Sequence, residues 1–423
     1  MIDIKIGDCR EVLKTLPAKH FQTCITSPPY YGLRDYGTAT WVGGSENCSH
    51  IGDTLGNNRN FIDEGGRGSN KDSLSTGDCI KCGAKRVDSQ IGLEETPEQF
   101  VESLVNVFRE IKRVLKDDGT LWLNLGDSYS SGGRTTTTNQ SVRGDKDYGV
   151  TRPPPVEGIK PKDLFGIPWR VAFALQADGW YLRQDIIWNK PNPMPESVQD
   201  RCTKAHEYIF LLSKSPHYYF DNVAIKEETI TFDNSNRDRD TTKLNNTPGR
   251  TKMAGLKTNQ YETRNKRSVW TVNTKPYKEA HFAVFPTDLI EPCVLAGSSA
   301  KICSGCGKSY RREMVTTDVP DRIVREHMVG VIPKRDKPSR MNSKDMLSLT
   351  KEDNGFVKQC KCDTDKTEQD RIIDPFGGSG TTALVADRHN RDATVIELNE
   401  EYIDIAKKRL EGDAPLFAKV EIS

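Results

Sequence analysis

The stretch "TSPPYY", residues 26 to 31, is the first in the chain whose residue types suggest chemistry. It directly follows the apolar run "FQTCIT". Pro28 and Pro29 lack a backbone N–H, so neither can continue a strand inside a sheet. We therefore expect a strand that ends at Ser27, followed by a rigid turn carrying a hydroxyl group and aromatic rings. In isolation, a proline-rich loop without a catalytic role is the plainer interpretation.

These groups suit a reaction at the exocyclic amino group of a nucleobase. The lone pair of such a nitrogen is delocalised into the ring, so the nitrogen needs acceptors that bind its hydrogens and favour tetrahedral geometry. Ser27 Oγ and the Pro28 carbonyl can supply two acceptors, aimed by the proline turn. The Tyr30 ring can stack on the base. A base in a duplex reaches such a site only when it is flipped out, which costs a few kcal/mol.

A second motif, "IIDPFGGSGTT", lies near the other end of the chain. It reads as a strand ending in Asp374, a loop with glycines between 377 and 380, and a helix that opens at Thr381. Glycines allow close backbone approach to a ligand and expose amide donors at the helix N-terminus. The motif is neither a P-loop nor G-x-G-x-x-G. Glu397 follows in "VIELN", at the end of the next strand, where a carboxylate can accept hydrogen bonds from ribose hydroxyls.

An ordinary strand–turn–helix connection with an exposed glutamate is the alternative interpretation of this second motif. A nucleoside-bearing cofactor with no pyrophosphate to hold fits the glycine loop and the acidic strand end better. S-adenosylmethionine meets that description.

The elements that must position both motifs alternate between strand and helix. Residues 2–26 read strand, helix, strand, and "TPEQFVESLVNVFREIKRVLKDDGTLWLNLGD" reads as one helix and a buried strand. In that segment Thr96 is the expected N-cap, Pro97 the first helical residue and Gly119 the helix end. This alternation predicts an α/β fold, whose ligands bind beyond the carboxyl ends of the strands.

Taken together, these residues resemble the amino-methylating DNA methyltransferases, which modify cytosine N4 or adenine N6. "TSPPY" is similar to that family's catalytic motif, (D/N/S)-P-P-(Y/F/W), and "DPFGGSGTT" to its cofactor motif. The catalytic motif precedes the cofactor motif, which is the circularly permuted order of the family's β group. The resemblance implies a Rossmann-like, seven-stranded, mostly parallel sheet with helices on both faces and the last strand inserted antiparallel.

The resemblance also assigns roles to residues. The implied catalytic positions are Ser27, Pro28, Pro29 and Tyr30. The implied contacts to S-adenosylmethionine are Asp374, Phe376, Gly378 and Glu397, together with Thr381, Asp8 in "GDC" and Pro286 in "FPTDLIEPCVLAGSS". "WNKPNPMPES" and "KAHEYIFLLSKS" resemble the wall of the target-base pocket. A serine at the first motif position resembles the N4-cytosine members more than the N6-adenine members, which usually carry aspartate.

The favoured hypothesis is a site-specific DNA methyltransferase of a restriction-modification system. It would transfer a methyl group from S-adenosylmethionine to N4 of a flipped cytosine without a covalent intermediate. Adenine N6 is the first alternative. An RNA or protein-amide methyltransferase, or a non-catalytic zinc-bearing nucleic-acid binder, comes next. Double-stranded DNA is the expected partner, whereas a cognate restriction endonuclease and the choice between monomer and homodimer stay open.

Most of the 11 cysteines, together with one histidine, fall into two groups with metal-ligand spacing. The first group is Cys48, His50, Cys79 and Cys82, and the second is Cys303, Cys306, Cys360 and Cys362. A structural zinc site needs four N or S ligands in a tetrahedron, and C-x2-C followed by glycine is a frequent turn in such sites. We expect one or two structural zinc ions, with unligated surface thiols as the alternative.

Composition separates the remaining segments. We expect the catalytic half to comprise residues 1–42 and 91–220, with a mobile loop at 130–163. A Cys/His insertion occupies 43–90, and a Cys-bracketed insertion occupies 301–369. The target-recognition segment is expected at 221–270, the cofactor helix region at 271–300 and the cofactor half at 370–423. Segment 221–270 offers Arg, Lys and Asn for phosphates and base edges, although a solvated linker is the alternative.

With a net charge of +1, any basic surface must be local. A charged N-terminus and no apolar run of membrane length predict a cytoplasmic protein.

Overall fold

The computed structural model divides into two compact units. It describes residues 1–32, 38–45, 47–50, 78–79, 81–130, 158–228, 263–275, 284–317, 350–413 and 420–423. The first unit contains residues 1–219, 268–298 and 370–423, and the second contains 220–267 and 299–369. Most of the predicted loop 130–163, and the middle of each segment predicted at 221–270 and 301–369, lie outside the described residues.

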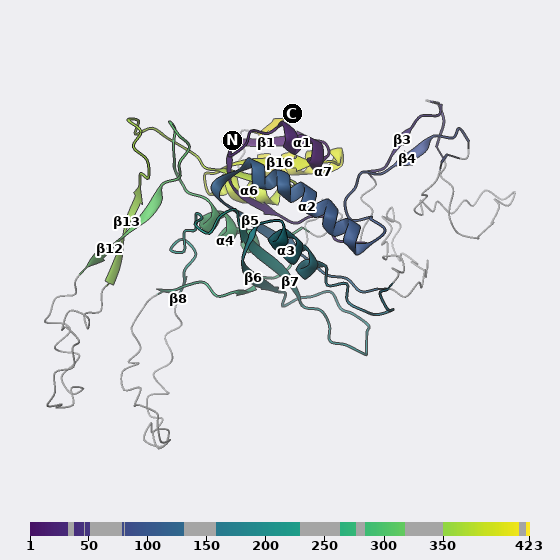
Figure 1. The fold of residues 1–423 in the computed structure, drawn as a ribbon, viewed down its shortest axis with the longest axis horizontal. Coiled ribbons are helices and arrows are strands. Elements are labelled where there is room, and N and C mark those ends of the chain that lie inside the picture. Colours follow the sequence, from purple (N-terminus) through teal and green to yellow (C-terminus); the bar gives the residue numbers. More distant parts are fainter. Residues whose placement is uncertain are drawn as a thin grey trace, which may run out of the picture. The chain divides into compact units, whose positions relative to one another are not determined.

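A nine-stranded sheet organises the first unit (Figure 1). Its strands, in spatial order, are β10 (Val269–Thr271), β6 (Tyr181–Asn189), β7 (His206–Ser213), β5 (Leu115–Leu125), β2 (Phe21–Thr26), β15 (Arg371–Asp374), β16 (Asp392–Glu397), β1 (Ile2–Ile6) and β17 (Val420–Ile422). Strand β7 runs antiparallel to both of its neighbours, and the other pairs are parallel.

The seven strands from β6 to β1 are the predicted seven-stranded sheet with one antiparallel strand, so the α/β methyltransferase-like fold is confirmed. The edge strands β10 and β17 were not expected. Each has three residues, which is too short for a strand pattern to be visible in the sequence.

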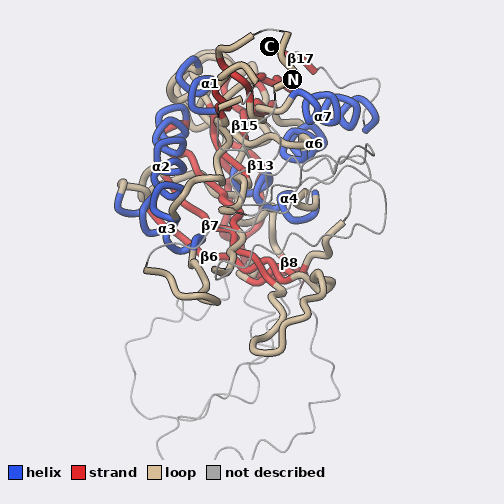
Figure 2. Tube along the Cα trace, turned by 90° about the vertical axis from the view of Figure 1, so that its right-hand side faces the viewer, coloured by secondary structure: helices blue, strands red, loops and turns tan. Residues whose placement is uncertain are grey.

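Helices cover both faces of the sheet, as Figure 2 shows for the first unit. On one face lie α1 (Cys9–Thr15), α2 (Pro97–Val114) and α3 (Ile167–Ala177), and on the other α4 (Thr287–Gly297), α6 (Thr381–Arg388) and α7 (Glu400–Asp413). Helices on both faces bury the central strands, and all six residues of β2 are buried, including the polar side chains of Gln22, Thr23 and Thr26.

The start of α2 was predicted correctly. Thr96 is its N-cap, and a capping box joins Thr96 to Gln99, with Pro97 in the first turn. The predicted end at Gly119 was wrong, because the helix stops at Val114 and Gly119 lies inside β5. A Cβ at Gly119 would lie 3.1 Å from the backbone oxygen of Gln22 on the neighbouring strand β2, so this glycine permits close approach of the backbone instead of ending a helix.

The second unit is built from short antiparallel strand pairs. Strand β11 (Ile302–Cys303) pairs with β14 (Thr367–Glu368), β12 (Arg311–Thr317) with β13 (Thr350–Val357), and β8 (Glu227–Glu228) with β9 (Thr263–Arg264). One further pair in the first unit joins β3 (Thr40–Val42), just before the Cys/His insertion, to β4 (Lys85–Val87), near the end of that insertion.

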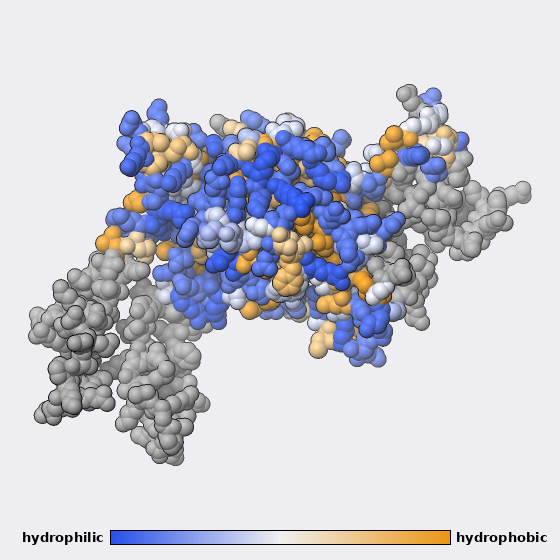
Figure 3. Space-filling model, in the orientation of Figure 1, coloured by the Kyte–Doolittle hydropathy of each residue, from blue (hydrophilic) through white to orange (hydrophobic). Residues whose placement is uncertain are grey.

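Hydrophilic side chains dominate the described surface on the face that Figure 3 shows. Among the helices that the structure describes, none combines the length and the apolar character needed to cross a bilayer.

Candidate functional site

The two sequence motifs, 348 residues apart, meet at the carboxyl ends of adjacent strands. Strand β2 pairs in parallel with β15, so the residues that follow each strand emerge at the same edge of the sheet. Thr26 Oγ1, the last side chain of β2, donates a hydrogen bond of 2.6 Å to Asp374 Oδ1, at the end of β15. Ser27 is therefore the residue next to a direct link between the two motifs.

Asp374 accepts hydrogen bonds from both ends of the glycine loop. Its carboxylate is buried, and its oxygens also accept hydrogen bonds from Thr382 Oγ1 at 2.6 Å and from the Phe376 amide at 3.0 Å. On the helix side, Arg409 Nη1 donates to Thr381 Oγ1 at 2.7 Å. The polar groups of Asp374 and Thr381 are thus engaged within the protein, where they fix the shape of the loop.

Burial gives Asp374 an unusual protonation equilibrium. Desolvation raises the pKa of its carboxyl group from 3.8 to about 7, against the hydrogen bonds from Thr26 and Thr382, which lower it. A folded-state pKa above the unfolded value favours the protonated form on folding. The stability that this group contributes is therefore fully present below about pH 4 and is lost as the pH rises towards about 7.

We expect the Asp374→Asn variant to gain stability relative to the wild-type protein as the pH rises from about 4 to about 7. The change should reach up to about 4 kcal/mol, because one pKa unit corresponds to about 1.4 kcal/mol. Urea unfolding of both proteins at several pH values measures the difference in their free energies of unfolding. The part of this difference that varies with pH reports the pKa of Asp374, and the part that does not vary reports the hydrogen bonds lost in the variant. A difference that does not vary with pH would contradict the raised pKa.

Glu397 and Asp8 lie at the ends of the two strands beyond β15. Strands β16 and β1 pair with Ile6 opposite Glu397. Glu397 Oε2 accepts from the Gly378 amide at 2.7 Å and Oε1 from the Asn399 amide at 2.9 Å. Burial raises the pKa of Glu397. Asp8 caps α1 and forms an ion pair with Arg10 at 2.5 Å.

These residues fit a nucleoside ligand. A carboxylate has about four lone-pair sites, and the backbone donors Gly378, Leu398 and Asn399 leave acceptor capacity on Glu397 for ribose hydroxyls. Gly378 adopts a φ of +50°, and no atom lies within 4 Å of the position that a Cβ would take there. The loop thus offers open space next to Glu397. Pro286 is the buried N-cap residue of α4, and Phe376 packs partly against the core.

At the catalytic motif, Ser27 and Tyr30 share a polar network. Ser27 Oγ donates to Asn124 Oδ1 at 3.3 Å, and Tyr30 O–H donates to Glu207 Oε2 at 2.7 Å. Asn124 Nδ2 in turn donates to the backbone oxygen of Tyr208 at 3.1 Å. Glu207 Oε1 also forms an ion pair with Lys190. Strands β5, β6 and β7 therefore orient the side chains that follow β2.

Close packing fixes the aromatic ring of the motif. A Cβ on Gly126 would lie 2.8 Å from Tyr30 Cδ2 and closer still to Cε2, so the ring packs directly against the backbone after β5. Gly92 likewise lies close to Pro29, because a Cβ at Gly92 would be 3.2 Å from the proline ring. The resemblance in the sequence implies that the segments of Lys190 and Glu207 line the base pocket, but the sequence carries no signal for Asn124 or Gly126.

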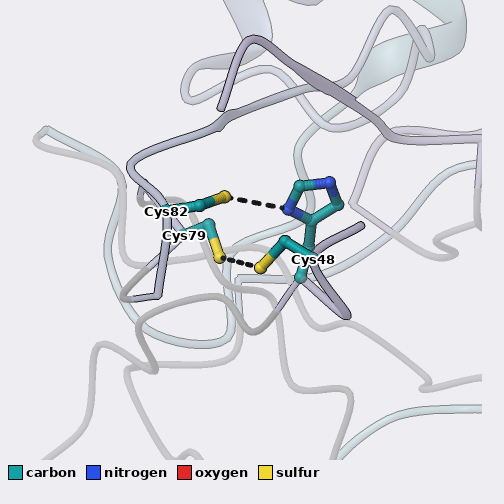
Figure 4. A group of neighbouring side chains, drawn as sticks. Cys48, Cys79 and Cys82 are labelled. Carbon is teal, nitrogen blue, oxygen red and sulfur yellow. Dashed lines mark hydrogen bonds between the residues drawn. The ribbon is translucent and has the colours of Figure 1, made fainter. Parts of the chain in front are cut away.

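The two groups of metal-ligand residues are each brought together. Within Cys48, His50, Cys79 and Cys82, and within Cys303, Cys306, Cys360 and Cys362, all ligand atoms lie within 4.8 Å of one another. In the first group the sulfurs of Cys48 and Cys79 are 3.8 Å apart, and Cys82 Sγ is 3.3 Å from His50 Nδ1 (Figure 4). A tetrahedron with Zn–S bonds of about 2.3 Å has sulfur–sulfur edges of about 3.8 Å.

Both C-x2-C-G segments form the same turn. The Gly83 amide donates to the Cys79 oxygen at 2.7 Å, and the Gly307 amide donates to the Cys303 oxygen at 2.8 Å. The φ angles of the two glycines are 71° and 69°, a left-handed conformation that favours glycine. Backbone donors from Gly305 and the following residue lower the pKa of the Cys303 thiol to about 7. Hydrogen bonds with the Cys306 and Cys360 thiols raise the pKa of Cys362, in the same group, to about 12, so zinc binding there would release a proton.

Comparison with known proteins gives consistent matches over most of the chain. Residues 21–301 and 349–408 match the DNA methylase family model for N6 and N4 methyltransferases. The Type II methyltransferase M.Cfr9I of Citrobacter freundii is 36% identical over 407 residues, 96% of this chain and 87% of that protein. M.SmaI of Serratia marcescens is 36% identical over 410 residues, 96% of this chain and 90% of that protein.

Among solved structures, the PvuII cytosine-N4-specific DNA methyltransferase is similar with a TM-score of 0.46 at 15% identity. The match covers 96% of this chain and 85% of that one.

Proposed function

The chain belongs to the DNA methylase family of N6 and N4 methyltransferases, and from this premise we propose that it methylates N4 of cytosine in double-stranded DNA. S-adenosylmethionine is the proposed methyl donor, and a flipped cytosine is the proposed acceptor. The relatives named Type II methyltransferases support a role in restriction and modification, with an endonuclease of the same specificity as the proposed partner.

The observation that carries this proposal is the hydrogen bond between Thr26 and Asp374. It places Ser27, at the end of β2, next to the loop after β15. A methyl group can pass from one ligand to another only when both lie in near-attack geometry, about 3–3.5 Å between reacting atoms. Two motifs from opposite ends of the chain have a common function only if folding brings them together in this way.

The cofactor supplies a methyl group on a positively charged sulfur. The residues around Ser27 prepare the amino group that attacks it. Ser27 directs its own hydrogen towards Asn124 Oδ1, which leaves the lone pairs of Oγ available for a hydrogen of the amino group. The Pro28 carbonyl is the proposed second acceptor. With both hydrogens bound, the nitrogen lone pair is less delocalised and more nucleophilic.

In the proposed step a nitrogen–carbon bond forms as the carbon–sulfur bond breaks. The electron pair of the broken bond stays on the sulfur, which leaves as a thioether. The extra proton on the methylated nitrogen then passes to water. Because the amino nitrogen itself attacks the methyl carbon, no protein residue needs to form a covalent bond to the base. The Tyr30 ring, held through its hydroxyl by Glu207, is the proposed stacking surface for the flipped base.

The choice of cytosine over adenine rests on Ser27, since aspartate at this position is usual in the N6-adenine members that the motif resembles. Adenine N6 remains the second candidate, because both amino groups present the same two hydrogens to the same two acceptors.

The test is to incubate the protein with labelled S-adenosylmethionine and unmethylated genomic DNA, and to identify the labelled nucleoside by mass spectrometry. N4-methylcytosine is the expected product. N6-methyladenine would overturn the assignment of the base and keep the mechanism. Label absent from DNA but present in RNA or protein would overturn the proposed substrate.

Zinc is proposed as a structural ion at each of the two Cys/His groups. The donor sets, the 3.8 Å sulfur–sulfur distance and the paired glycine turns fit tetrahedral Zn²⁺ with four protein ligands, which leaves no open position for catalysis. The ions would hold together segments that have few apolar residues of their own.

We expect about two zinc equivalents in protein purified without chelators, because each complete four-ligand site binds one ion. Cys82→Ala should remove one equivalent and Cys306→Ala the other, as measured by inductively coupled plasma mass spectrometry. Cys293→Ala, at a buried cysteine of α4 outside both groups, is the matched control and should keep both. Less than about half an equivalent in the wild-type protein would contradict both sites.

A further inference from the structure

The positive charge of the chain is concentrated in the second unit. Residues 220–267 and 299–369 contain 25 Lys and Arg against 18 Asp and Glu, a net charge of +7. The rest of the chain contains 36 basic and 42 acidic residues, a net charge of −6. These opposite charges nearly cancel, so the net charge of +1 for the whole chain does not reveal them. The net charge of the second unit therefore favours long-range attraction of a polyanion such as DNA to this part of the protein.

An ion-pair network joins the two segments of the second unit. Arg312, on β12, lies in the later segment and donates to Asp221 Oδ2 in the earlier one at 2.7 Å and to Asp353 Oδ2 on β13 at 2.5 Å. Asp221 is buried, and its other oxygen accepts from the Val223 and Ala224 amides at 3.2 Å. The ion pair between Arg312 and Asp221 thus connects the insertion at 299–369 to the segment at 220–267.

Four exposed lysines lie close in sequence to the cysteines of the Cys303 group, namely Lys301, Lys308, Lys361 and Lys366. The Cys303 amide donates to the Lys308 oxygen at 3.0 Å, and the Ser304 amide to the Lys366 oxygen at 3.1 Å. Lys361 lies between two of the cysteine ligands. Lys358, in contrast, points inward and donates to the backbone oxygens of Cys362 and Thr364. The four-cysteine cluster therefore sets the positions of exposed cations.

We propose that the described part of the insertion, residues 299–317 and 350–369, is a DNA-binding element, in which the four-cysteine cluster presents these four lysines to the phosphates of duplex DNA. The sequence predicts target recognition in a different segment, 221–270. This inference rests on the proposed function and adds a second DNA-binding region to it, one that contributes affinity through phosphates instead of base readout.

A structural role for the lysines is the rival explanation. Four thiolates around one Zn²⁺ carry a net charge of −2, as expected for a complete four-cysteine site, and nearby cations offset it. Charge reversal would then release zinc and lower the melting temperature, with any loss of DNA binding following from unfolding.

The experiment uses the full chain with Lys301, Lys308, Lys361 and Lys366 all replaced by Glu. The control carries Lys14→Glu and Lys408→Glu, at exposed lysines of α1 and α7 in the first unit. Fluorescence anisotropy with a labelled duplex, at several salt concentrations, gives affinity and salt dependence. Zinc content, melting temperature and S-adenosylmethionine affinity are measured on the same samples.

We expect the fourfold variant to bind the duplex at least about tenfold more weakly, with zinc content and cofactor affinity unchanged. The slope of log K against log salt should also become shallower, by about 0.9 for each phosphate that the variant no longer neutralises. Wild-type affinity and slope would overturn the inference, as would a loss of zinc that accounts for weaker binding. If the wild-type protein binds DNA but transfers no methyl group to it, the proposed function fails and this inference does not.

Discussion

The Ser27→Ala variant is expected to lose about 100-fold or more in kcat for DNA methylation, with its affinity for S-adenosylmethionine unchanged. Removing one preorganised hydrogen-bonding group from an active site typically costs about 10²–10³ in rate. The Ser27 hydroxyl bonds to Asn124, whereas Gly378 of the glycine loop bonds to Glu397. The loss should therefore fall on the acceptor amino group and spare the cofactor.

Single-turnover kinetics with labelled cofactor measure the rate, and calorimetry measures cofactor binding. Ser215→Ala is the matched control, because this serine also donates one hydrogen bond, to the His217 oxygen at 2.6 Å, in the bend after β7 of the same unit. Adding Pro28→Ala to Ser27→Ala should abolish transfer. A Ser27→Ala enzyme with wild-type kcat would place the reaction elsewhere in the protein.

The sequence was sufficient wherever a local pattern determines structure. The capping box of α2 needs only Thr96 and Gln99, three residues apart, and each C-x2-C-G turn is contained in a single short segment. The two motifs could also be placed at one sheet edge, because each directly follows an apolar strand. The predicted carboxyl-end location is a general property of parallel sheets.

What the sequence could not show is which distant side chains share hydrogen bonds. Asn124 lies 97 residues from Ser27, in the half of β5 that is buried at every position. Its contact with Ser27 depends on the register between β2 and β5, which shifts at an irregularity between Phe21 and Thr23. The charge separation was hidden for a similar reason, since it requires knowing that 220–267 and 299–369 form one unit.

The Gly126→Ala variant is expected to lose about tenfold or more in kcat/KM for DNA, again with cofactor affinity unchanged. The added Cβ would lie 2.8 Å from Tyr30 Cδ2 and closer still to Cε2. Overlap this close forces the ring to move. The ring is anchored by its hydroxyl, which bonds to Glu207 at 2.7 Å, so movement breaks that bond and displaces the proposed stacking surface.

Gly412→Ala is the matched control for this substitution. Gly412 lies on α7 with no atom within 4 Å of its added Cβ, and alanine in a helix is up to about 1 kcal/mol more favourable than glycine. We expect this control to keep wild-type kinetics and an equal or higher melting temperature. A loss shared by both variants would reflect a general effect of adding a methyl group to a glycine.

A double-mutant cycle with Tyr30→Ala shows whether Gly126 acts through the ring. If the added methyl group works only by displacing Tyr30, then Gly126→Ala has no further effect on kcat/KM in the Tyr30→Ala background. Additive losses would mean that Gly126 shapes the site independently, for example through the backbone that leads from Asn124 to Asp127. Tyr30 follows β2 and Gly126 follows the adjacent strand β5. If Gly126→Ala has no further effect in the Tyr30→Ala background, the pairing of these two strands determines where the ring, and therefore the base, is positioned.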